Sequence, residues 1–159
     1  MKRLTLVRHA KAEGKGPHSR DFERALTRRG HEEAEALAQR LLEHALIPDL
    51  LIASPAQRTK QTAEILALKL GLAADRLQHE KRLYLADSQD LLRVVQSAAP
   101  KAQHLMIVGH NPGLSELATF LTSGALPDEL ATGEACSMTF MVQAWSDIRP
   151  DPVQEVRRV

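Results

Sequence analysis

The segment Leu4-Thr5-Leu6-Val7-Arg8-His9 places a mainly apolar run directly before an arginine and a histidine. The run Leu50-Leu51-Ile52-Ala53 likewise precedes Ser54, and Leu105-Met106-Ile107-Val108 precedes Gly109-His110. Short apolar runs that end at polar residues or glycine are typical of buried strands. We therefore expect three buried strands, each followed at its carboxyl end by residues suited to binding or catalysis.

Helical patterns lie between these strands. Apolar residues three and four positions apart predict helices over 28–45, 55–70, 89–98 and 112–121. The expected N-caps are Thr27, Ser54, Ser88 and Asn111, and Gly71 is the expected end of the second helix. A weak strand over 77–83, an alternating segment over 138–142, a turn at 147–152 and a last strand over 154–159 complete the pattern. This alternation predicts an α/β fold, a three-layer α/β/α sandwich whose mainly parallel sheet has an antiparallel edge.

Length and composition exclude several classes of protein. The chain has 159 residues, of which 43% are hydrophobic and 26% charged, as in an ordinary globular domain, so we expect one domain over 1–159. A net charge of +1 and an aromatic content of 3% argue against nucleic acid as a partner. The single cysteine, Cys136, excludes an internal disulfide and a cysteine-cluster zinc site, and we expect it to be a buried hydrophobe.

The amino-terminal segment carries no pattern of a secretory signal. Only four mainly apolar residues follow Met1-Lys2-Arg3, and the other apolar runs are far shorter than a membrane-spanning helix. We therefore expect a cytoplasmic protein without a membrane partner.

Cationic side chains gather at the predicted strand ends. In open α/β sheets, ligands bind beyond the carboxyl ends of the strands. There the sequence brings Arg8 and His9, then Arg58 one helical turn after Ser54, then His110. Two guanidinium groups and two imidazoles suit a compact anion such as a phosphoryl group, and an imidazole can attack phosphorus without a metal or cofactor. Singly, these residues are more often salt-bridge partners or caps; together they predict an anion site.

The same residues resemble a known family. Leu6-Val7-Arg8-His9-Ala10 is similar to the Arg-His-Gly signature of the histidine phosphatase superfamily, whose fold is that of phosphoglycerate mutase, with alanine in place of the usual glycine. The segments 21–30, 53–63 and 108–112 resemble its small SixA-type branch of phosphohistidine phosphatases, in the same order along the chain.

The resemblance implies roles for four residues. His9 is expected to be the nucleophile that becomes phosphorylated, Arg8 and Arg58 to bind the phosphate, and His110 to contact the phosphate oxygens. It implies a metal-independent phosphatase without a cofactor, whose substrate is phosphohistidine on a phosphotransfer protein. A small phosphate ester as substrate, or a phosphate-binding regulator without turnover, remain the alternatives.

The proton donor is not identified by the sequence. Asn111 stands where acid phosphatase relatives carry an aspartate, and Glu13, Asp21, Glu80 and Asp87 are all candidates. A phosphorylated imidazole can be protonated before it leaves, whereas an alkoxide needs a donor. A pocket poor in acids therefore favours phosphohistidine.

Two further groups of residues remain open. The basic side chains of the 10–26 segment either guide an acidic or phosphorylated partner or belong to a solvated loop, and the segment itself is expected to be a lid or a partner surface. They are Lys11, Lys15, Arg20 and Arg24. The other histidines show no metal-ligand spacing and are expected at the surface or at helix ends. They are His18, His31, His44, His79 and His104.

Overall fold

A single mixed sheet forms the centre of the molecule. The computed structural model describes residues 1–126, 128–150 and 153–159. Its strands are β1 (Lys2–Arg8), β2 (Leu50–Ala53), β3 (Leu77–His79), β4 (His104–Gly109), β5 (Ala135–Phe140) and β6 (Val153–Arg158). They lie in the order β3-β2-β4-β1-β5-β6, the first four parallel, with β5 antiparallel to both of its neighbours. The predicted α/β class and antiparallel edge are therefore confirmed.

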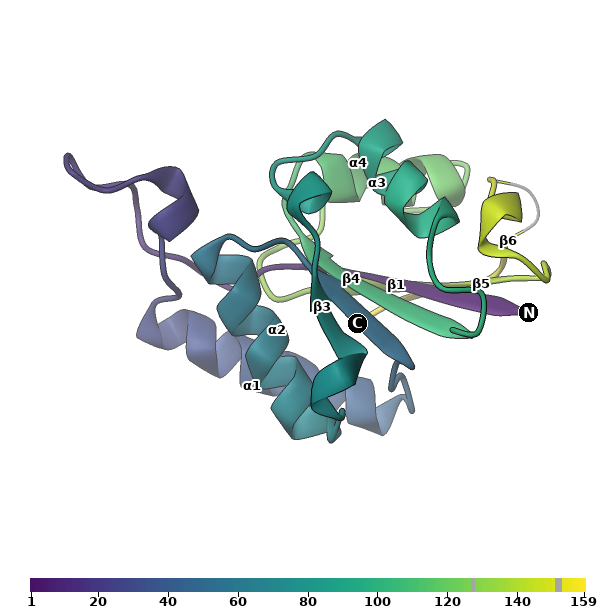
Figure 1. The fold of residues 1–159 in the computed structure, drawn as a ribbon, viewed down its shortest axis with the longest axis horizontal. Helices are drawn as coiled ribbons and strands as arrows, with labels where there is room; N and C mark the ends of the chain where they lie inside the picture. Colours follow the sequence, from purple (N-terminus) through teal and green to yellow (C-terminus); the bar gives the residue numbers. More distant parts are fainter. Residues whose placement is uncertain (127, 151–152) are drawn as a thin grey trace.

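Helices cover both faces of this sheet (Figure 1). The helices are α1 (Arg28–Glu43), α2 (Gln57–Leu70), α3 (Ser88–Gln96) and α4 (Gly113–Leu121). Residues of α1 and α2 pack with Val7, Met106 and Val108, while α3 and α4 pack with Leu6 and Ile107. Side chains alternate between the two faces along a strand, so β1, β2, β4 and β5 each contribute to both cores. The three-layer prediction is confirmed.

Two of the predicted helix ends are correct. Thr27 is the N-cap of α1, where its side chain accepts a hydrogen bond from the Gly30 backbone N–H at 3.0 Å. Gly71 ends α2 with a φ of +70°, a left-handed conformation that costs glycine little because it has no Cβ.

The other three predicted N-caps are wrong by one or two positions. Ala56 precedes α2, Asp87 caps α3 through the Asp90 N–H, and Pro112 precedes α4. Ser54 instead follows directly after β2, and its hydroxyl has a partner more distant in the sequence, described below. Asn111 still accepts the Ser115 backbone N–H at 3.2 Å, so it satisfies a first-turn donor from just outside the helix.

Some predicted boundaries also change. The third helix ends at Gln96 rather than at Ala98, and the weak strand shortens to β3, followed by a 3-10 turn over Lys81–Leu83. The last strand begins one residue earlier than expected. The end of the predicted turn at 147–152 includes residues 151 and 152, which lie outside the described residues.

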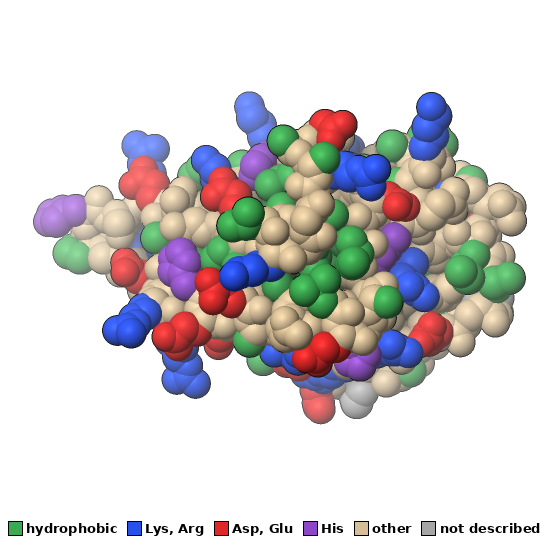
Figure 2. Space-filling model, turned by 90° about the horizontal axis from the view of Figure 1, so that it is seen from below, with side chains coloured by type: hydrophobic (Ala, Val, Ile, Leu, Met, Phe, Trp, Pro, Cys, Tyr) green, Lys and Arg blue, Asp and Glu red, His purple; other side chains and the backbone are tan. Residues whose placement is uncertain are grey.

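The surface mixes both signs of charge. On the face shown in Figure 2, Lys and Arg side chains alternate with Asp and Glu instead of gathering in one patch. Among the described residues, no helix has both the length and the apolar character needed to cross a membrane.

Gly30 of α1 lies close to the backbone of Lys11, which follows β1, and this contact predicts how a substitution at Gly30 changes the stability of the protein. A Cβ on Gly30 would collide with the backbone oxygen of Lys11. We expect Gly30→Ala to lower the free energy of unfolding by about 1–3 kcal/mol, because overpacking outweighs the roughly 1 kcal/mol gain in helix propensity. Urea denaturation measures the change. Gly14→Ala, where a Cβ meets nothing within 4 Å, is the matched control, and an equal effect in both variants would contradict this explanation.

Candidate active site

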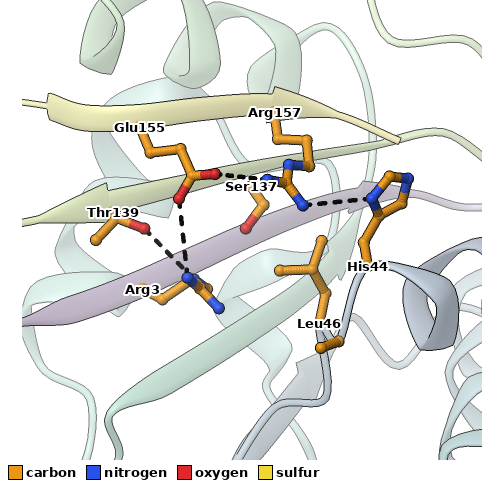
Figure 3. A pocket seen from close by; sticks show the side chains of 8 residues that line it. Arg3, His44, Leu46, Ser137, Thr139, Glu155 and Arg157 are labelled. Atoms are coloured by element: carbon orange, nitrogen blue, oxygen red, sulfur yellow. Dashed lines mark hydrogen bonds and ion pairs between the residues drawn. The ribbon is translucent and has the colours of Figure 1, made fainter.

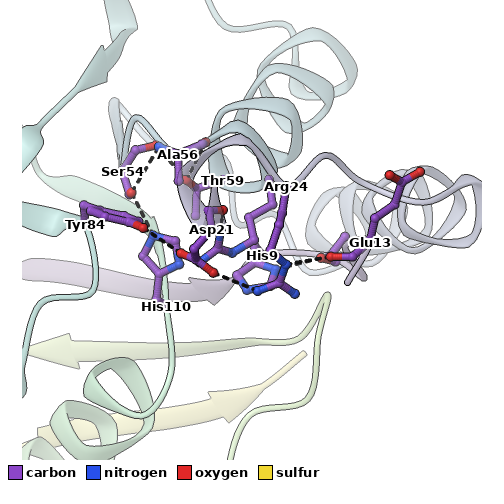
Figure 4. Close-up of polar contacts among 11 residues, drawn as sticks. His9, Glu13, Asp21, Arg24, Ser54, Ala56, Thr59, Tyr84 and His110 are labelled. Carbon is purple, nitrogen blue, oxygen red and sulfur yellow. Dashed lines mark hydrogen bonds and ion pairs between the residues drawn. The ribbon is translucent and has the colours of Figure 1, made fainter. Parts of the chain in front are cut away.

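The carboxyl ends of three parallel strands meet around one pocket. The register pairs Arg8 of β1 with Gly109 of β4, so His9 and His110 leave the sheet as neighbours, their ring centroids 5.6 Å apart. Arg58 enters from the first turn of α2, which follows β2. A cavity of about 340 Å³ is lined by all four of the residues that the sequence predicted, Arg8, His9, Arg58 and His110. Figure 4 shows the polar contacts around it.

His9 is held with one nitrogen occupied. Its Nδ1 lies 2.7 Å from the backbone oxygen of Ala10. A carbonyl only accepts, so Nδ1 carries the hydrogen and Nε2 keeps its lone pair. Burial, together with the charges of Arg58 and Arg8, lowers the pKa of His9 from the ordinary 6.5 to about 4. The ring is therefore neutral at neutral pH, as a nucleophile must be.

His110 is held through its Nε2 atom, whereas His9 is held through Nδ1. Its Nε2 lies 2.8 Å from the hydroxyl of Ser54, while its buried Nδ1 has no hydrogen-bond partner in the part of the chain that the structure describes. Burial, with the charge of Arg58 as the next cause, lowers the pKa of His110 to about 3. The pocket therefore holds two neutral imidazoles beside two permanent positive charges.

The two arginines keep free donors. Arg8 Nη1 donates to the backbone oxygen of Leu130 at 3.0 Å, and Arg58 donates from Nη1 and Nη2 to Asp21, at 2.8 Å to the backbone oxygen and 3.0 Å to Oδ2. The Nε atoms of both arginines are buried, and neither has a hydrogen-bond partner among the described residues. Buried donors without partners are costly, so a ligand oxygen that reached these two atoms would be stabilised there.

Asp21 connects the 10–26 segment to the pocket. Its carboxylate accepts hydrogen bonds from Tyr84 Oη at 2.6 Å, Arg58 Nη2 at 3.0 Å and Arg24 Nη1 at 3.0 Å. The Tyr84 hydrogen bond, followed by those from Arg24 and Arg58, holds the pKa of Asp21 well below its usual range. Asp21 is therefore an ionised partner of Arg58, which makes it unsuitable as a proton donor.

The other three candidate donors lie outside the pocket lining. Glu80 is paired with Arg82 at 2.8 Å, and hydrogen bonds from Arg82 lower its pKa. Asp87 is the N-cap of α3. Glu13 is exposed and contacts the site only through its backbone oxygen, which accepts from Arg24 Nε at 2.6 Å. None of the four candidates places a protonated carboxyl group in the cavity.

Several pocket residues escaped the sequence analysis. Tyr84, the only tyrosine of the chain, reaches Asp21 and packs edge-on against His110, with ring centroids 5.5 Å apart. Leu85 and Thr132 line the cavity and were also missed, and Asn111, which the sequence analysis had named, lines it as well. The sequence did contain a signal for Tyr84 and Leu85, because they follow the weak strand predicted over 77–83. The carboxyl end of that strand lies at the same edge of the sheet as those of the other parallel strands, so the residues after it were also candidates for the site.

The basic side chains of the 10–26 segment divide into two groups. Lys11 and Arg24 line the cavity, whereas Lys15 and Arg20 do not. The segment is tied to the body by the backbone pairing of Ala12 with Leu26 and by Asp21. In Figure 1 it projects beyond the ends of the helices, with Asp21 at its short 3-10 turn.

A second cavity, of about 260 Å³, lies beside β5 and β6 (Figure 3). Its two arginines share one carboxylate: Glu155 lies 3.9 Å from Arg3 and 2.8 Å from Arg157. Arg3 also donates to the Thr139 hydroxyl, and Arg157 lies within hydrogen-bond distance of His44. Among the described residues, the buried donors without a partner lie at the first cavity and not at this one.

His104 is the exception among the remaining histidines. The expectation of a surface position is wrong, because it is buried with Nε2 2.8 Å from the hydroxyl of Thr5 on β1. Burial lowers its pKa to about 4.

Cys136 is buried as expected, and burial raises its pKa to about 11. Within the part of the chain that the structure describes, no three His, Cys, Asp or Glu side chains come together as metal ligands.

Comparison with known proteins agrees with this fold and site. The model of the histidine phosphatase superfamily (branch 1) matches residues 4–84, about half of the chain. The chain therefore belongs to the histidine phosphatase superfamily.

Solved structures narrow the class to the SixA-type branch. A protein assigned as the phosphohistidine phosphatase SixA of Agrobacterium tumefaciens is 30% identical, with a TM-score of 0.77 over 86% of this chain and 90% of that one. Its counterpart from Nakamurella multipartitia is 27% identical, with a TM-score of 0.81 over 98% and 95%. The protein histidine phosphatase SixA complexed with tungstate shares the fold, at 22% identity and a TM-score of 0.76 over 87% and 88%. This membership supports a phosphatase.

The lowered pKa values predict the behaviour of the site in acid. Both imidazoles should stay neutral on acidification until about pH 4 for His9 and about pH 3 for His110. The unfolded chain takes up these protons near the ordinary 6.5, so the free energy of unfolding should fall as the pH drops from about 6.5 toward 4. Imidazole NMR titrations, with signals assigned by His9→Ala, measure the transitions. Transitions of both rings near pH 6.5 would contradict the described environment.

Proposed function

We propose that this protein is a metal-independent phosphatase that transfers a phosphoryl group to His9 and then to water. The observation that carries the proposal is the orientation of His9. Its Nδ1–H is bound to the Ala10 oxygen, so the lone pair of Nε2 is left for phosphorus. Free Nε–H donors of Arg8 and Arg58 lie in the same site. They supply positive charge where the phosphoryl oxygens bind.

The reaction has two steps. The Nε2 lone pair of His9 forms a bond to phosphorus while the bond from phosphorus to the leaving group breaks. The leaving group departs with the electron pair of that bond, and a substrate imidazole that was protonated beforehand leaves as neutral histidine. Water then attacks phosphohistidine 9. The P–N bond breaks, Nε2 recovers its lone pair as neutral histidine, and the proton lost by water goes to the released phosphate and solvent.

The preferred substrate in this proposal is phosphohistidine on a protein. Of the candidate acids, only Asp21 lines the cavity, and it is held ionised. Asn111 offers no acid either, because its amide donates to the Leu130 oxygen at 2.9 Å and accepts from Ser115. An imidazole leaving group that is protonated in advance needs no such donor, whereas an alkoxide does.

Rapid-quench labelling tests the mechanism. With a phosphohistidine-carrying phosphotransfer domain as donor, we expect an acid-labile, base-stable phosphoryl group on His9. His9→Ala should lose both the label and turnover while keeping its circular dichroism spectrum, because the side chain lies beyond the end of β1. Full turnover by this variant would refute the covalent route.

The same assay separates the alternatives. Faster hydrolysis of sugar phosphates than of the phosphohistidine domain would favour an ester phosphatase. Phosphate binding by the wild-type protein without any label or hydrolysis would favour a non-catalytic regulator.

Arg58 should contribute to both binding and chemistry. Its guanidinium is almost fully buried, and removing one preorganised donor of this kind costs about 10²–10³ in rate. We therefore expect Arg58→Ala to lower kcat/KM by about 10²-fold or more and to weaken inhibition by inorganic phosphate. Arg82→Ala is the matched control, because Arg82 pairs with Glu80 outside the pocket. If the two variants behave alike, Arg58 does not bind the phosphoryl group.

A further inference from the structure

The hydroxyl of Ser54 contacts His110 instead of capping α2. A Ser-Pro sequence before a helix predicts a capping serine, but α2 begins three residues later, after Ala56. Ser54 is completely buried, and its Oγ lies 2.8 Å from His110 Nε2 (Figure 4). From the described backbone, Ser54 Oγ accepts the Ala56 N–H alone, at 3.4 Å.

The hydrogens in this contact can be assigned. A serine hydroxyl has one hydrogen to donate, and it also accepts hydrogen bonds. Its two lone pairs could accept both the Ala56 N–H and an N–H of His110, so the acceptor available to the hydroxyl hydrogen decides the direction. Among the described residues, His110 Nε2 is the one acceptor within hydrogen-bond distance of Ser54 Oγ. The opposite direction would leave the buried hydroxyl hydrogen without an acceptor, so the geometry favours an unprotonated Nε2 and a neutral ring with its hydrogen on Nδ1. That Nδ1 is the buried atom without a partner.

We propose that Ser54 is a positioning residue that holds His110 in its Nδ1–H tautomer, so that the ring offers an N–H donor to the bound phosphoryl oxygen. The opposite tautomer would direct a lone pair at the anion instead. The proposal rests on the proposed function, because it assigns the anion as the partner of Nδ1.

The two imidazoles then differ in role although they carry their hydrogen on the same atom. The Ala10 oxygen takes the Nδ1–H of His9, leaving a lone pair on Nε2, which suits a nucleophile. The Ser54 hydroxyl takes the Nε2 lone pair of His110, leaving an N–H on Nδ1, which suits a donor. A single backbone oxygen and a single hydroxyl thus distinguish the two histidines.

Nitrogen-15 NMR of the imidazole rings tests this assignment directly. At neutral pH we expect the wild-type His110 signal to show a protonated Nδ1 and an unprotonated Nε2. In Ser54→Ala the two nitrogens should move toward the averaged shifts of a ring that exchanges between tautomers. A wild-type ring protonated on Nε2 would overturn the proposal without any variant.

Activity and phosphate binding provide the second readout. We expect Ser54→Ala to lower kcat roughly tenfold or more, with a smaller change in KM, and to weaken binding of inorganic phosphate. Thr59→Val is the matched control. The Thr59 hydroxyl donates to the backbone oxygens of Ser54 and Ala56 in the same turn. Equal losses in both variants, with unchanged His110 shifts, would show that Ser54 is merely structural.

The two proposals can fail separately. If the wild-type protein hydrolyses nothing, but its His110 carries the hydrogen on Nδ1 and Ser54→Ala weakens phosphate binding, the positioning role stands and the enzymatic function fails. If turnover proceeds through His9 while Ser54→Ala retains full activity and the wild-type shifts, the enzymatic function stands and the positioning role fails.

Discussion

The parallel register between β1 and β4 is the constraint on which the site depends. It aligns Arg8 with Gly109, and the His9 backbone N–H continues the pairing by donating to the Gly109 oxygen at 3.2 Å. A slip of one residue would turn every side chain of a strand to the opposite face. Leu6 and Ile107 pack in the core on one face of the sheet, and Val7 and Val108 pack in the core on the other face. This packing opposes a slip between the strands, and it therefore also keeps His9 and His110 side by side.

The strand ends could be predicted from the sequence because they depend on local patterns. Short apolar runs mark β1, β2 and β4, and parallel strands bring their carboxyl ends to one rim, so Arg8, His9 and His110 could be grouped without coordinates. The contact of Tyr84 with Asp21 and that of Ser54 with His110 could not be predicted, because the partners lie 63 and 56 positions apart in the sequence. His104 was misplaced for the same reason: its burial depends on a hydroxyl across the sheet, on Thr5.

Burial explains why the pocket is neutral at its histidines and positive at its arginines. Removing a charge from water is costly, and a histidine avoids the cost by losing its proton, whereas an arginine cannot. Arg58 is instead compensated by Asp21, the carboxylate that also binds Tyr84 and Arg24. The 10–26 segment therefore supplies the counter-charge that allows a guanidinium to remain buried beside two neutral imidazoles.

Asp21 and a phosphoryl group need not compete for Arg58. A guanidinium has five N–H donors in a fixed plane. Asp21 takes one from Nη1 and one from Nη2, and the buried Nε–H remains without a partner. Arg58 can thus bind an anion through a different edge while Asp21 keeps the plane of the group in place. The ion pair that neutralises Arg58 before substrate arrives is then the same contact that orients it afterwards.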